Sequence, residues 1–225
     1  MRTIQLGAFV IGLLALSVAQ AAARPEPVLN VVELQKLIAS GTPGDNARLA
    51  THFTALADQS ASEARRHQTM SSGFGVNPNR QLGSHMAPHC NRLAKLNEEA
   101  AATLRELAAH HQKLAAGISS TAPSAGAAYQ SGLGARVPTE SDLKDLAAKA
   151  STAADHRALM EYFSETANRQ KATADDHARM AQSYRGGRIA SAAVHCDHMV
   201  RVSREAAKEA TAAATMHKDL AGIAR

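Results

Sequence analysis

The chain of 225 residues contains the same pattern twice, and this internal repeat constrains its fold more than any other feature. Residues 52–70 (HFTALADQSASEARRHQTM) align with residues 162–180 (YFSETANRQKATADDHARM), and phenylalanine, histidine and methionine positions coincide. The two cysteines, Cys90 and Cys196, each directly follow a histidine, and each precedes another histidine by 21 residues. The fold must therefore contain two similar units, at about residues 30–117 and 139–222.

Each unit has the pattern of a short helix followed by a long helical hairpin. Apolar residues recur every three or four positions, as in Leu49, Phe53 and Leu56 of the first unit. Turns rich in Gly, Asn and Pro interrupt the pattern at 71–79 and 185–187. Aromatic residues make up 3% of the chain while alanine is abundant, which favours thin, closely packed helices. We predict an all-α protein, a four-helix bundle formed by two homologous helical hairpins, each preceded by a short helix.

The first residues have the plan of a secretory signal peptide. Arg2 precedes an apolar run of roughly a dozen residues, and small residues near Ala21 to Ala23 suit cleavage. We expect a periplasmic or secreted protein whose mature chain has no membrane span, because no later stretch supplies ~20 apolar residues. The predicted organisation is a signal peptide (1–23), a first hairpin repeat (24–118), a linker (119–138) and a second hairpin repeat (139–225).

Charge and motifs exclude several classes of function. The net charge is +5, but export and the lack of aromatic stacking platforms argue against a nucleic-acid partner. Covalent haem needs C-x-x-C-H, and a di-metal carboxylate centre needs E-x-x-H; the sequence has neither pattern at its cysteines or its interior acid, Glu63. No cleft for a nucleophile is indicated either. We therefore expect a protein that is not an enzyme and carries no haem.

The matched histidines and cysteines predict a transition-metal site. Residues a whole number of heptads apart share a helix face, which places these side chains on the same stripe as core Phe and Leu. If both turns lie at one end, two histidines and two cysteines converge as a Cys₂His₂ shell suited to zinc, and nearby thioethers would favour copper, especially Cu(I). The predicted ligands are His67, His89, Cys90, His177, His195 and Cys196. The possible additional ligands are Met70, Met86, Met180, Met199, His111 and His217.

Other arrangements are compatible with the same residues. If the linker inverts the second hairpin, His217 approaches Cys90 and His111 approaches Cys196, which makes two smaller sites. A Cys90–Cys196 disulfide would instead give a stapled interaction module without a metal, acting on a protein partner or a second copy of the chain. The histidines could equally be helix residues satisfied by local hydrogen bonds.

Several short motifs resemble those of a group of exported bacterial helical proteins that are alanine-rich, carry a His-Cys motif and are uncharacterised. The motifs are Thr42-Pro43-Gly44-Asp45, residues 154–159 (ADHRAL) with Tyr162-Phe163, His177-x-x-Met180-Ala181 with Tyr184, and His-Cys itself. The resemblance covers both repeats. The first repeat departs from it, with His52 in place of Tyr162 and Asn46 in place of His156. The resemblance implies no activity.

Overall fold

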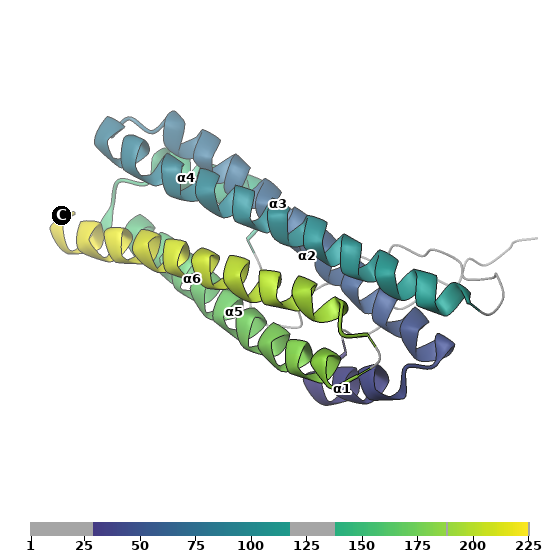
Figure 1. The fold of residues 1–225 in the computed structure, drawn as a ribbon. Coiled ribbons are helices and arrows are strands. Elements are labelled where there is room, and N and C mark those ends of the chain that lie inside the picture. Colours follow the sequence, from purple (N-terminus) through teal and green to yellow (C-terminus); the bar gives the residue numbers. More distant parts are fainter. Residues whose placement is uncertain (1–28, 118–137, 188, 225) are drawn as a thin grey trace, which may run out of the picture.

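The computed structural model describes residues 29–117, 138–187 and 189–224, and within them every regular element is a helix. A short helix and a hairpin of two long helices occur twice in succession (Figure 1), which confirms the all-α prediction. The six helices are α1 (Val31–Ser40), α2 (Pro43–Gly75), α3 (Arg80–Ala116), α4 (Glu140–Lys149), α5 (Ala153–Arg185) and α6 (Ala192–Ile223). The predicted signal peptide and most of the linker lie outside the described residues.

Threonine caps begin the first long helix of each hairpin. The Thr42 hydroxyl accepts a hydrogen bond from the backbone N–H of Asp45 at 3.2 Å, and Pro43 occupies the first turn of α2. In the second repeat the Thr152 hydroxyl accepts from the N–H of Asp155 at 3.2 Å, and the Asp155 carboxylate in turn accepts from the Thr152 N–H. Equivalent sequence thus starts equivalent helices.

The two hairpins run in opposite directions. His111, near the end of α3, bonds to Tyr184, near the end of α5. At the other end of the molecule, His217 of α6 stacks on Phe74 of α2. The turn of each hairpin therefore lies beside the open end of the other, and an approximate two-fold axis relates the repeats. This is the inverted arrangement considered above.

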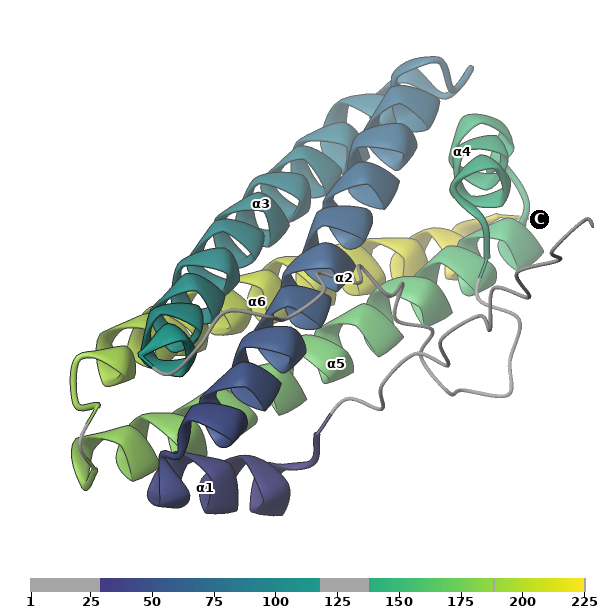
Figure 2. The ribbon, with the colours of Figure 1, turned by 90° about the vertical axis from the view of Figure 1, so that its right-hand side faces the viewer.

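Each short helix packs against the hairpin of the other repeat. Helix α1 contacts α5, and α4 contacts α2 (Figure 2). The Asn77 side-chain amide, just after α2, donates to the carbonyl oxygens of Ala147 (2.9 Å) and Ala150 (3.3 Å) at the end of α4. These bonds satisfy carbonyls that the helix itself leaves free. The two repeats therefore contact each other through their short helices as well as through their long helices.

Gly73 allows the close approach of α2 to α4. A Cβ at this position would lie 2.6 Å from the carbonyl oxygen of Lys144 and 3.0 Å from the Cβ of Ala147. We expect Gly73→Ala to lower the free energy of unfolding by about 1–3 kcal/mol, because backbone must move to relieve the overlap. Gly75→Ala is the matched control, since a Cβ added at Gly75 would meet nothing within 4 Å. Urea denaturation of both variants measures the difference, and equal stabilities would contradict this account.

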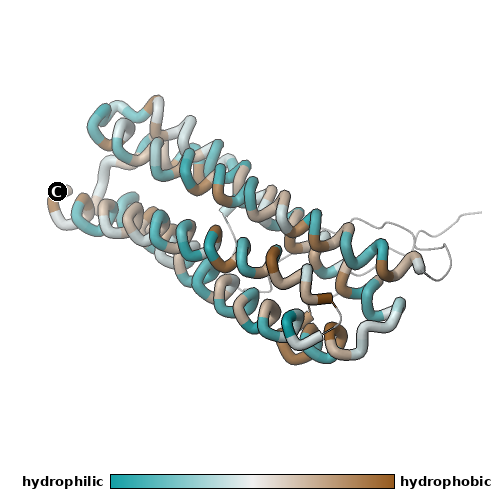
Figure 3. The backbone as a smooth tube through the Cα atoms, in the orientation of Figure 1, coloured by the Kyte–Doolittle hydropathy of each residue, from teal (hydrophilic) through white to brown (hydrophobic). Residues whose placement is uncertain are grey.

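Alanine dominates the interior between the hairpins. Helix α3 packs on α6, and α6 buries Ala206, Ala210 and Ala213 almost completely. Apolar and polar residues alternate along each long helix in Figure 3, as expected of helices with one buried face. Opposite this thin seam, α2 and α5 face each other through larger side chains, including the stacked rings of His67 and Phe163. The polar interior lies on this second side.

Candidate functional site

Aromatic and histidine rings form two columns, one at each end of the bundle. In the first ring column successive centroids are 5.8, 5.8 and 6.3 Å apart and planes differ by at most 27°. In the second, centroids are 5.7 and 5.6 Å apart. The first ring column is Phe74, His217, Phe163 and His67. The second is Tyr184, His111 and Phe53. Each ring of the second occupies the repeat-equivalent position of a ring in the first, so the matched histidines are part of a duplicated core.

His111 in the second ring column has a hydrogen bond at each ring nitrogen. Its Nδ1 donates to the side-chain oxygen of Asn46 at 2.8 Å, and its Nε2 accepts from the Tyr184 hydroxyl at 2.7 Å. Burial lowers the pKa of His111 to about 4, which keeps the ring neutral as this pattern requires. Both nitrogens are used, so we interpret His111 as structural.

His217, the equivalent residue in the first ring column, has different neighbours. His156 replaces Asn46 and Phe74 replaces Tyr184. The Nδ1 atoms of His217 and His156 face each other at 3.2 Å, while Nε2 of His217 is buried without a hydrogen-bond partner in the described structure. Burial, reinforced by His156 and His89, lowers the pKa of His217 to about 3. Two neutral imidazoles thus share one buried contact and at most one proton can occupy it.

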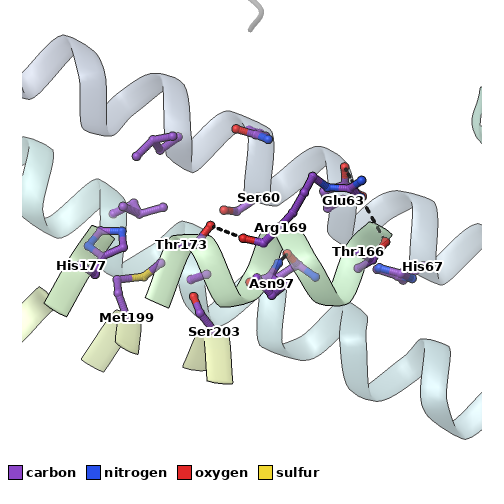
Figure 4. Close-up of a pocket in the computed structure, with 15 residues that line it drawn as sticks. Ser60, Glu63, His67, Asn97, Thr166, Arg169, Thr173, His177, Met199 and Ser203 are labelled. Atoms are coloured by element: carbon purple, nitrogen blue, oxygen red, sulfur yellow. Dashed lines mark hydrogen bonds and ion pairs between the residues drawn. The ribbon is translucent and has the colours of Figure 1, made fainter. Parts of the chain in front are cut away.

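A polar cavity of about 60 Å³ lies at the centre of the molecule, between α2 and α5 (Figure 4). Asn97 of α3 and Ser203 of α6 form its floor, and His67 and His177 lie toward its two ends. His67, His177 and Ser203 are at most 1% exposed. Both nitrogens of His67, Nδ1 of His177, Oγ of Ser203 and Oε2 of Glu63 have no hydrogen-bond partner among the described residues. Buried polar atoms are normally paired, so this concentration makes the cavity a candidate binding place.

The cavity carries charges of both signs. Oε1 of Glu63 pairs with Arg66 at 2.7 Å and lies 3.9 Å from Arg169. Burial, with added repulsion from Arg169 and Arg66, lowers the pKa of His67 to about 3. Burial and then the charge of His52 lower the pKa of His177 to the same value. At neutral pH both histidines are therefore uncharged.

The cysteines lie far apart. His195, beside Cys196, is 3.5 Å from Glu106, which lies sixteen residues beyond Cys90 in α3. This separation is about 24 Å along the helix, whereas a disulfide needs Cα atoms within ~7 Å. Both thiols are free, so the Cys90–Cys196 bridge does not fit this fold. Burial raises the pKa of the Cys90 thiol far above its usual range and that of Cys196 to about 12, so both stay protonated at neutral pH.

Convergence of His67, Cys90, His177 and Cys196 is predicted for hairpins with both turns at one end, and the hairpins instead point in opposite directions, so this condition is not met. No three His, Cys, Asp or Glu side chains of the described chain are grouped to hold one metal ion. His89 and His195 lie half-buried on the α3–α6 seam, where they pair with Glu209 (2.5 Å) and Glu106 (3.5 Å). The possible additional ligands Met70, Met86, Met180 and Met199 are buried in the core, and Met199 also lines the cavity.

Several residues of these sites are not among the predicted ligands, and His156 and Arg169 are the two that matter most here. His156 is a mismatch between the repeats, and Arg169 is a half-buried charged residue beside the interior stripe of α5. The repeat alignment could have pointed to His156. It places His156 where the first repeat has Asn46, so His217 must have a different hydrogen-bond partner from His111. Arg169 gives no such signal.

Comparison with protein families, with curated proteins and with solved structures finds no match for this chain. Among the helices that the structure describes, none is both long enough and apolar enough to cross a membrane. The geometry of the cavity and of the His156–His217 pair is therefore what indicates the function of the chain.

Proposed function

We propose that this is an exported, non-enzymatic protein that binds a transition-metal ion, copper or zinc, at the His156–His217 pair. The observation that carries the proposal is the 3.2 Å distance between the two facing Nδ1 atoms. Two nitrogen ligands at 2.0–2.1 Å from one tetrahedral ion are about 3.3 Å apart. The distance between the nitrogens therefore already suits two ligands of one ion, and each ring has to turn so that its lone pair points at the ion rather than at the other nitrogen.

Protonation supports the same proposal. A metal ion binds the neutral imidazole, and burial lowers the pKa of both His217 and His156, so lone pairs are present at neutral pH. Water would complete the coordination. The thiols of Cys90 and Cys196 are left out of the proposed site because burial keeps them protonated.

The second ring column provides the design of the test. His156→Asn copies Asn46, and Phe74→Tyr copies Tyr184, so the double variant rebuilds at the first column the hydrogen bonds that satisfy His111. We expect the unchanged protein to bind about one Zn²⁺ or copper ion per chain, and His156→Asn to weaken binding by about a hundredfold or more. The double variant should bind equally weakly while remaining folded.

Metal analysis and the visible absorption of bound Co²⁺ measure the outcome. The protein is produced with its own residues 1–23 and recovered from the periplasm of a bacterial host, which tests export in the same preparation. His85→Asn, which removes an exposed histidine, controls for nonspecific binding. A protein that retains no ion, or equal affinities in the unchanged protein and His156→Asn, would show that the pair is an ordinary hydrogen bond.

A further inference from the structure

The central cavity is chemically separate from the His156–His217 pair. Its unpartnered atoms include an anionic acceptor, Oε2 of Glu63, which is buried at 9% exposure on α2. Arg66 holds the other oxygen of this carboxylate at 2.7 Å and so fixes its orientation. The other oxygen is left without a partner, and a donor that enters between α2 and α5 could satisfy it once the side chain turns toward the cavity.

Arg169 faces this carboxylate from α5, and its donors are incompletely used. Its Nη2 donates to the Thr166 hydroxyl at 3.0 Å. Its two carboxylate neighbours, Glu63 and Glu165, are both 3.9 Å away, beyond hydrogen-bond distance. Figure 4 shows the Arg169 and Glu63 side chains on facing helices at the same part of the cavity. A guanidinium in this state can bind a further carboxylate through two parallel bonds.

These two groups together restrict the charge of a ligand. A metal ion or other simple cation is opposed by Arg66 and Arg169, and a simple anion is opposed by the free oxygen of Glu63. The cavity of about 60 Å³ leaves space for a few heavy atoms only. Ser60 and Gln170, which also line the cavity, are half-buried, so the cavity is not closed off by fully buried side chains.

We propose that the central cavity binds a small zwitterion, a primary ammonium and a carboxylate joined by one or two carbons, as in the smallest amino acids. The ammonium donates to Oε2 of Glu63, and the carboxylate accepts from the guanidinium of Arg169. Ser203 and His67 are among the other polar residues that line the cavity. This proposal does not depend on the metal site, because the two share no residue.

Calorimetric titration with glycine, acetate and methylammonium tests the charge requirement. We expect glycine to bind at least about tenfold more tightly than either singly charged analogue. Glu63→Gln should weaken glycine binding about tenfold and strengthen acetate binding, because the repelling charge is gone. Arg169→Gln should weaken glycine binding and strengthen methylammonium binding. Such opposite changes cannot come from a general loss of structure.

Glu165→Gln is the matched control, since this carboxylate approaches Arg169 at the same 3.9 Å from the exposed side. Its glycine affinity should equal that of the unchanged protein. Binding of acetate or methylammonium as tight as glycine would overturn the proposal in favour of a plain anion or cation site. Failure of all three probes to bind would overturn it in favour of a water-filled cavity.

Discussion

Acidification from pH 7 to pH 5.5 is expected to lower the free energy of unfolding by about 2–3 kcal/mol through His67 and His177 alone. Both rings are at most 1% exposed, and burial lowers the pKa of each from 6.5 to about 3. In the unfolded chain they titrate near 6.5. Below that pH the unfolded state binds more protons than the folded state, so stability falls as the pH falls toward 3 and is unaffected by these groups well above 6.5.

The groups that face the two rings act in the same direction. Arg66 of α2 and Arg169 of α5 further disfavour a charged His67, and His52 disfavours a charged His177. Urea denaturation at several pH values measures the effect. In His67→Leu the loss between pH 7 and pH 5.5 should be smaller by about 1 kcal/mol, the share of one histidine. A variant that loses as much stability as the unchanged protein would show that His67 is already accessible to protons.

Phe163→Ala should be the most destabilising single change in the first ring column, at about 3–5 kcal/mol. The Phe163 ring is fully buried and lies between two histidine rings, with centroids 5.8 Å from His217 and 6.3 Å from His67. Its loss leaves a cavity that the neighbouring rings cannot fill without losing their stacking. This is a large share of the roughly 5–15 kcal/mol that holds a typical domain folded.

Guanidinium denaturation at pH 7.5 measures this effect, with two comparisons. Phe53→Ala removes the equivalent ring of the second ring column, which is also fully buried, and should cost a similar amount. Phe163→Leu keeps most of the volume and should cost less than half as much. A loss below about 1 kcal/mol for Phe163→Ala would mean that the column does not support the core.

The sequence predicts helices and faces well but not the direction of the hairpins. Heptad spacing places Cys90 and His111 on one face of a helix, and both are buried in the structure. Spacing does not specify which end of one hairpin meets which end of the other, because a linker over 119–138 is long enough for either connection. The inverted arrangement separates the cysteines, brings His217 to Phe74, and brings His111 to Tyr184.

The central cavity was beyond sequence reasoning for a related reason. Glu63, Asn97 and Arg169 come from three helices, and their proximity depends on how far α2 stands from α5. Glu63 is identifiable as an interior acid from its place on the stripe. Its partner Arg66 is on a neighbouring face of the same helix, and Arg169 belongs to the other repeat, so no local pattern connects them.

The placement of α1 on α5 and of α4 on α2 also bears on how such a chain could arise. In a single ancestral unit the short helix would lack the second hairpin on which it packs here. Two such units could have formed a dimer in which each short helix packed on the hairpin of the other unit. Duplication and fusion of the gene would keep this packing within one polypeptide. It also allows the two halves to differ, as they do where Asn46 and Tyr184 of one end correspond to His156 and Phe74 of the other.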